Sequence, residues 1–178
     1  MKNMEASEKR FVHLYTGNGK GKTTAAIGLA VRAAGHGMKT YIGQFMKGQL
    51  YGELTALKNH PLITIEQYGD TKCIRREDVT LNHIEQARQG LARAKDAMYS
   101  GQYDILVMDE INVTVWFGLL SVKDVIDVLS QRPENLEVIL TGRNAPKELI
   151  DAADLVTEMK EVKHYYTQGV LARDGIER

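Results

Sequence analysis

A glycine-rich segment near the N-terminus has the residue types that bind phosphate groups. It reads Thr-Gly-Asn-Gly-Lys-Gly-Lys-Thr-Thr over positions 16–24 and precedes an Ala-rich stretch. In a phosphate-binding loop, glycines let backbone N–H groups curl around the anion, a lysine reaches the outer phosphates and a hydroxyl holds Mg²⁺. The helix N-terminus that follows such a loop adds a positive dipole. The predicted nucleotide contacts are Gly17, Asn18, Gly19, Lys20, Gly21, Lys22, Thr23 and Thr24.

The spacing of this loop departs from the usual G-x-x-x-x-G-K-[ST] pattern. That pattern would place a glycine at position 16, where the sequence has Thr16, so the loop that begins at Gly17 is one residue shorter. The sequence therefore leaves open whether the phosphates bind to this loop in the usual register. A tight strand-to-helix turn that binds nothing is the alternative interpretation, and the three glycines among Asn and Lys residues make it the weaker one.

Three charged residues follow two further apolar stretches. Asp109 and Glu110 come directly after the stretch 105–108, and Arg143 follows the stretch 138–141 with one glycine between. Parallel sheets in α/β proteins bind ligands at the carboxyl ends of their strands, so we expect these side chains to face the glycine-rich loop. Asp109 would hold a metal through water, Glu110 would contact metal or nucleotide directly, and Arg143 would neutralise phosphate charge. The alternatives are helix-capping acids and a solvated loop arginine.

Three other features leave their roles open. Arg32, His36 and Lys39 lie near the end of the first predicted helix, where basic side chains also complement the helix dipole. The C-terminal segment 163–173 is rich in aromatic and basic residues, and it either folds over the site or forms a surface strap. Cys73 has no Cys or His at ligand spacing, so we expect a buried small side chain.

Alternating strands and helices must position these residues. Short β-branched apolar runs recur at helix-length spacing, which is typical of βαβ units and a parallel sheet. The strand candidates are Phe11–Tyr15, Thr40–Phe45, Ile63–Tyr68, Ile105–Met108, Val138–Thr141 and Leu155–Met159. Their continuous apolar pattern predicts burial on both faces. The helix candidates are Thr23–Ala34, Leu81–Tyr99, a helix after the capping box Ser121–Asp124 that stops at Pro133, and a short one after Pro146. We therefore predict a three-layer α/β fold of the phosphate-loop NTPase (RecA-like) type, with a mostly parallel sheet of about six strands and helices on both faces.

The length and the charge of the chain limit its domain organisation and the partners that it can bind. The 178 residues predict one domain over 1–178 with a mobile N-terminal tip at 1–10. The 23 basic and 23 acidic residues cancel, so no overall field attracts nucleic acid or an acidic membrane. No apolar run approaches the ~18 residues of a membrane span. The first ten residues lack the apolar region of a secretory leader, and the single cysteine excludes an internal disulfide. We expect a cytoplasmic protein that binds neither nucleic acid nor membrane.

Five segments together resemble the phosphate-loop type of ATP:corrinoid (cob(I)alamin) adenosyltransferase, over about residues 11–177. They are the segment 16–24, Arg32–Gly37, Val107–Glu110, Leu140–Arg143 and Val162–His164. The resemblance implies transfer of the 5′-deoxyadenosyl group of ATP to the Co(I) centre of a reduced corrinoid, with release of triphosphate. It also implies Mg²⁺ or Mn²⁺, a cytoplasmic homodimer, and an electron donor for Co(I), for which a flavoprotein is a candidate. In that family the nucleotide lies reversed relative to other phosphate-loop proteins, which agrees with the altered loop spacing.

The resemblance also implies roles for individual residues. The loop Gly17–Thr24 would cradle the phosphates, and the catalytic residues would be Lys22, Glu110 and Arg143. Thr23 and Glu110, with Asp109, would hold the metal. Asn18, Arg32 and His164 would lie near the ribose or the base. No residue of the sequence stands out as a general base, and Co(I) needs none because it is itself a strong nucleophile.

One segment departs from the family pattern. Where members of the family have an aromatic pair that helps displace a ligand below the cobalt, this sequence has Gly69–Ile74 without an aromatic residue. The departure concerns the corrinoid contacts and leaves the nucleotide half of the site unaffected. Two other functions remain open at this point: a RecA-like ATPase or nucleotide switch that acts with a partner protein, and a non-catalytic nucleotide-binding module.

Overall fold

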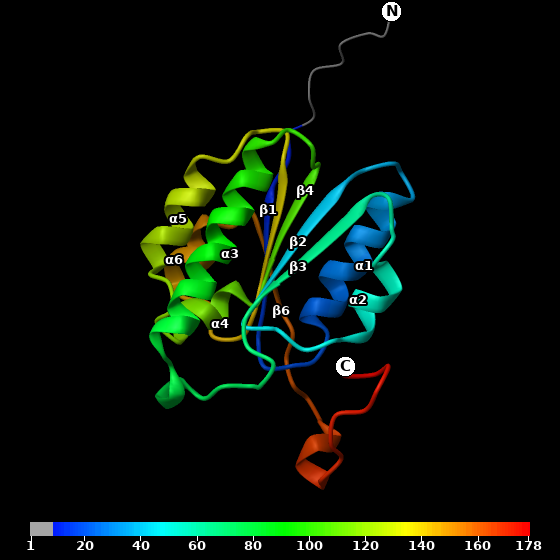
Figure 1. Ribbon diagram of the computed structural model, residues 1–178, viewed down its shortest axis with the longest axis vertical. Helices are drawn as coiled ribbons and strands as arrows, with labels where there is room; N and C mark the ends of the chain where they lie inside the picture. The colour runs from blue at the N-terminus through cyan, green and yellow to red at the C-terminus, as the bar shows by residue number, and fades with distance from the viewer. Residues whose placement is uncertain (1–8) are drawn as a thin grey trace, which may run out of the picture.

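The computed structural model describes residues 9–178, and the described strands form a six-stranded sheet. All five strand pairs are parallel, and the spatial order is β3-β2-β4-β5-β1-β6 (Figure 1). The strands are β1 Val12–Thr16, β2 Thr40–Phe45, β3 Ile63–Tyr68, β4 Ile105–Asp109, β5 Glu137–Thr141 and β6 Leu155–Glu158. The prediction of a parallel sheet of about six strands is confirmed.

Helices cover both faces of the sheet. Figure 1 shows α1 and α2 on one side of the strands, and α3, α4, α5 and α6 on the other. The helices are α1 Lys22–Ala34, α2 Gly52–Leu57, α3 Leu81–Tyr99, α4 Ile111–Trp116, α5 Val122–Ser130 and α6 Lys147–Ala152, with 3₁₀ turns η1 at Arg76–Asp78 and η2 at Tyr165–Gln168. The three-layer arrangement predicted from the sequence is therefore present.

Alternate residues of the central strands enter two separate hydrophobic cores. Leu106 and Met108 of β4 pack into the core beneath α3 and α5, whereas Val107 packs into the core beneath α1. All three side chains are at most 1% exposed. Because successive side chains of a strand point to opposite faces, burial of both faces produces the unbroken apolar runs of the sequence.

The predicted strand bounds lie within one residue of the observed ones at each end. The capping box of α5 is also present, since Asp124 N–H donates to Ser121 Oγ (3.1 Å) and Ser121 N–H donates to Asp124 Oδ2 (2.8 Å). The sequence did not predict α2 and α4. Each has only six residues, too few to display a helical apolar stripe.

Two burial predictions are wrong. β6 is the outermost strand and pairs only with β1 within the described chain, so Leu155 and Val156 remain 44% and 42% exposed rather than buried on both faces. An apolar run of four residues cannot reveal whether its strand lies at the edge of a sheet. Cys73 is exposed, because it lies in the irregular segment after β3 and not in an element that packs on the sheet.

The chain ends bear on two further predictions. Of the predicted mobile tip at 1–10, residues 1–8 lie outside the described residues, and Arg10 N–H donates to the Glu134 carbonyl (2.9 Å). Among the helices of residues 9–178, none combines the length and the apolar content that a membrane crossing requires.

Substitution of Gly90 in α3 tests how tightly this helix packs on the sheet, and substitution of Gly28 in α1 is the control. A Cβ built at Gly90 of α3 would lie 2.8 Å from Tyr68 Cγ and 2.9 Å from Phe45 Cε1, whereas one built at Gly28 of α1 meets no atom within 4 Å. We expect Gly90→Ala to lower the free energy of unfolding by about 1–3 kcal/mol through overpacking. Gly28→Ala should raise it by about 0.4–1 kcal/mol, because alanine restricts the unfolded chain. Urea unfolding of both variants checks this, and equal stabilisation by both would contradict the packing.

Candidate active site

A cavity of about 710 Å³ opens at the edge of the sheet where the strands end. The phosphate loop forms one wall and the connection from β2 to α2 forms another. Its lining includes Gly19–Thr24, Lys47, Tyr51, Glu53, Glu110, Arg143, His164 and the last four residues, 175–178. The strand ends of β1, β2, β4 and β5 therefore bring together most of the residues that the sequence singled out.

The phosphate loop needs its glycines partly because another segment of the chain touches it. Gly17 (φ +92°) and Gly21 (φ +116°) adopt left-handed conformations that other residues rarely take. A Cβ at Gly17 or Gly19 would lie 2.5 or 2.6 Å from the carbonyl oxygen of Met159. Gly19 N–H donates to that oxygen at 2.6 Å. The segment after β6 thus fixes the shape of the loop and occupies one of its amide groups.

Lys22, the first residue of α1, turns back over the loop. Its ammonium donates to the carbonyl oxygens of Gly17 and Gly19, both at 2.7 Å, and the residue is 6% exposed. Burial lowers the pKa of Lys22, although the nearby carboxylate of Glu110 opposes the shift. The ammonium contacts only neutral acceptors, so its charge is available to an anion in the cavity.

Lys20 faces the C-terminal segment instead. Its ammonium donates to Glu177 Oε1 (2.7 Å) and to the Tyr165 hydroxyl (3.2 Å). Hydrogen bonds from Arg173 and Lys20 hold the pKa of Glu177 far below its usual range. Of the segment 163–173, for which the sequence left two arrangements open, His164 alone lines the cavity, and residues 175–178 beyond it line the cavity as well.

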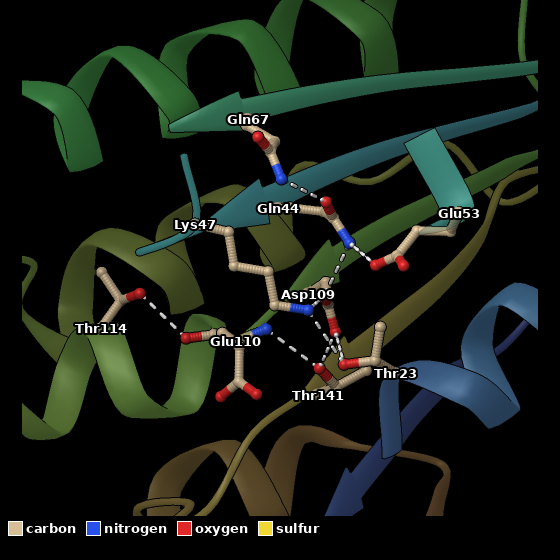
Figure 2. Close-up of polar contacts among 9 residues, drawn as sticks. All are labelled: Thr23, Gln44, Lys47, Glu53, Gln67, Asp109, Glu110, Thr114 and Thr141. Carbon is tan, nitrogen blue, oxygen red and sulfur yellow. Dashed lines mark hydrogen bonds and ion pairs between the residues drawn. The ribbon is translucent and has the colours of Figure 1, made fainter. Parts of the chain in front are cut away.

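Asp109 is the buried centre of a polar cluster (Figure 2). Its Oδ1 accepts from the hydroxyls of Thr23 (2.9 Å) and Thr141 (2.6 Å). Its Oδ2 accepts from Lys47 Nζ (2.8 Å) and Gln44 Nε2 (3.4 Å). Only 1% of Asp109 is exposed, and four donors occupy its two oxygens. The predicted contact of Asp109 with a metal through water therefore requires one of these donors to move away.

Glu110 is placed quite differently from its neighbour. It has a left-handed backbone (φ +63°), fixed by a hydrogen bond from its N–H to Thr141 Oγ1 (2.9 Å) and one from Thr114 Oγ1 to its carbonyl (2.9 Å). Figure 2 shows its carboxylate pointing away from the Asp109 cluster, and within residues 9–178 no hydrogen bond or ion pair engages it. Burial and the charge of Asp109 raise the pKa of Glu110. An unpartnered carboxylate at a cavity wall suits a bound cation.

The oxygens at this wall fit a metal that arrives with a nucleotide. Residues 9–178 contain no group of three or more acidic, His or Cys side chains arranged to hold a metal ion. Mg²⁺ at nucleotide sites needs only one or two protein oxygens, because phosphates and water complete its coordination. The Thr23 hydroxyl and the Glu110 carboxylate supply such oxygens.

The remaining predicted residues divide into two groups. Arg143, Thr24 and His164 line the cavity. Arg32 and Asn18 are exposed and do not line the cavity. Arg32 lies in the last turn of α1, more than two helical turns beyond Thr24. Their proposed place near the ribose or the base remains a prediction.

Comparison with known proteins decides the family. The family model described as ATP:corrinoid adenosyltransferase BtuR/CobO/CobP matches residues 8–178. The chain belongs to this family. It is 37% identical over 177 residues to the corrinoid adenosyltransferase CobA of Salmonella typhimurium, covering 97% of this chain and 88% of the relative. It is 34% identical over 172 residues to the corrinoid adenosyltransferase of Escherichia coli K12, covering 96% and 86%. The sequence-based resemblance is confirmed.

Sequence reasoning missed the part of this adenosyltransferase site that β2 and β3 contribute. Lys47 follows β2 and reaches Asp109, while Gln44 Nε2 donates to Glu53 Oε1 (3.0 Å) and Gln67 Nε2 donates to Gln44 Oε1 (3.0 Å). The signal was present, because glutamines interrupt two apolar strands near their carboxyl ends. The strand-end argument that selected Asp109 applies equally to β2.

Substitution of the two loop lysines tests the assignment of the phosphate-reaching one. Lys22→Ala should lower kcat/KM for adenosyl transfer by about 100-fold or more, the range seen when an electrostatic stabiliser is lost. Thr23→Ala should have a comparable effect. Lys20→Ala is the matched control and should be milder, because its ammonium faces Glu177. Steady-state kinetics in which Lys20 is essential and Lys22 dispensable would contradict this register of the loop.

Proposed function

We propose that this protein transfers the 5′-deoxyadenosyl group of ATP to the Co(I) centre of a corrinoid and releases triphosphate. The proposal rests on one observation. In this member of the family, the phosphate loop opens on a cavity that is lined by Lys22, Lys47 and Arg143. These cationic side chains suit a polyphosphate. The whole triphosphate is a leaving group that departs only if its charge is neutralised.

The chemistry that we propose balances without a group on the protein that activates water. The electron pair of Co(I) forms the new cobalt–carbon bond at C5′, and the pair of the breaking C5′–O bond leaves with the triphosphate. The protein orients C5′ in line with the metal centre of the corrinoid and excludes other nucleophiles. Lys22, Arg143 and the free loop amides stabilise the departing charge. A bound Mg²⁺ or Mn²⁺ ion would supply further charge neutralisation at the phosphates.

A RecA-like ATPase or nucleotide switch is not favoured. Relatives that match 96% and 97% of the chain are named corrinoid adenosyltransferases. The fold alone would have left this alternative open, because one architecture serves many chemistries.

Several finer points of the proposal rest on the family resemblance. They are a homodimeric assembly, an electron donor for Co(I) such as a flavoprotein, Mg²⁺ or Mn²⁺ as the ion, and a cytoplasmic location. The balanced charge of the chain supports the further expectation that it binds neither nucleic acid nor a membrane surface.

The most direct test of the proposal is to identify which bond of ATP breaks. ATP alone should be almost inert, whereas a Co(I) corrinoid under strict reduction should give triphosphate in a 1:1 ratio with new cobalt–carbon bonds. Phosphorus NMR of the mixture, beside the visible spectrum of the corrinoid, measures both products. Stoichiometric ADP and phosphate, or rapid ATP loss without corrinoid, would show that the chain is an ordinary ATPase.

The segment Gly69–Ile74 should contact the corrinoid and not ATP. It begins where Gly69 packs against the backbone of Met46 and Lys47, beside the cavity wall, and Lys72 is exposed. We expect Lys72→Ala to raise the KM for the corrinoid and leave that for ATP nearly unchanged. Lys123→Ala, on the surface of α5, is the matched control and should change neither constant. Equal changes in both KM values of the Lys72 variant would overturn the assignment.

A further inference from the structure

Backbone packing fixes the position of Lys47 at the carboxyl end of β2. Met46 has φ +57°, a left-handed conformation uncommon for a side chain of this size, and it turns the chain back over the edge of the sheet. A Cβ at Gly69 would lie 2.3 Å from Met46 C and 2.4 Å from Lys47 N, and one at Gly48 would lie 2.4 Å from Gly69 O. Two glycines thus let the ends of β2 and β3 touch, and the contact places Lys47 at the cavity.

The ammonium of Lys47 lies between two oxygens of the candidate site. It donates to Asp109 Oδ2 at 2.8 Å and to Thr23 Oγ1 at 3.3 Å, and its side chain is 15% exposed. Burial lowers the pKa of Lys47, but the carboxylates of Asp109, Glu110 and Glu53 outweigh it, so the pKa is raised and the group stays charged.

A divalent metal on Thr23 would compete with this ammonium. The Thr23 hydroxyl donates its proton to Asp109 Oδ1, so the oxygen faces Lys47 with its lone pairs. A Mg²⁺ ligand lies at about 2.0–2.1 Å from its metal. Two cations so close to one oxygen repel each other strongly in a partly buried site. Metal and ammonium therefore exclude each other here.

We propose that Lys47 is a positioning residue that acts as an internal counter-ion: it holds Thr23 and Asp109 in place and keeps divalent metal out of the site until a nucleotide brings the metal with its phosphates. The proposal rests on the proposed function only for the identity of the nucleotide. The triphosphate offers new acceptors in the same cavity, and the flexible lysine stem can turn to them while the backbone of the loop stays fixed. Without Lys47, the carboxylate of Asp109 and the Thr23 hydroxyl become available as oxygen ligands that suit Mn²⁺ or Mg²⁺ alone, and the Glu110 carboxylate lies at the same cavity.

Titration of the protein with Mn²⁺ in the absence of nucleotide tests this. Electron paramagnetic resonance measures the Mn²⁺ that remains free. We expect weak binding to the wild type and binding at least tenfold tighter to Lys47→Met, which keeps the apolar stem and removes the charge. Lys47→Arg retains the charge and should behave like the wild type. A purely structural ion pair predicts no gain of Mn²⁺ affinity in Lys47→Met, and that result would overturn the proposal.

A second pair of variants guards against misfolding. Lys47→Met leaves Asp109 as an unpaired buried charge, which is destabilising. Lys47→Gln can still donate to Asp109, so it should fold and show the same gain in Mn²⁺ affinity. The double variant Lys47→Gln with Asp109→Asn loses an anionic ligand and should lose most of that gain; retention of the full gain would place the Mn²⁺ elsewhere and overturn the proposal. None of these measurements involves a corrinoid or turnover, so a failure of adenosyl transfer would not change what they show about Lys47.

Discussion

The buried carboxylate of Asp109 is the interaction on which the site depends. It lies at the end of β4 and accepts hydrogen bonds from the first turn of α1, from β2, from the loop after β2 and from β5. A charge with 1% exposure is tolerated only when it is paired and hydrogen-bonded. Satisfying this one group therefore brings together three regions that are distant in sequence, namely the first turn of α1, the end of β2 with the loop after it, and β5. The cavity walls follow from that convergence.

The contrast between Asp109 and Glu110 shows how two adjacent carboxylates acquire different tasks. The first is saturated by protein donors and orients other residues. The second has a left-handed backbone that swings its side chain toward the cavity, where Lys22, Lys47 and Arg143 also lie. Such a backbone costs of order 1–3 kcal/mol, and the two hydrogen bonds that involve threonine hydroxyls help to hold it. Asp109 therefore holds the elements of the site together, whereas Glu110 faces the cavity in which a ligand would bind.

The C-terminal segment contributes to the same site from outside the sheet. The carbonyl of Met159 fixes the phosphate loop, and Glu177 pairs with Lys20 at the cavity lining. The short loop has two lysines, and this contact gives them unequal positions. The ends of β2 and β3 are joined in a comparable way by Gly48 and Gly69, which connects the nucleotide wall to the segment proposed to meet the corrinoid.

The features that depend on local patterns could be predicted from the order of the residues. Strand rhythm, the capping box at Ser121 and the glycine-rich loop are set by side-chain periodicity and by backbone preference, which act over a few residues. The meeting of Lys22, Glu110 and Arg143 at one edge followed from a general property of parallel sheets. The strand order and the exposure of β6 depend on contacts between distant parts of the chain and emerged only from the fold. The fold also decided the partner of Lys47, because a contact across 62 residues of chain depends on how β2 and β4 lie beside each other and leaves no periodic trace in the sequence.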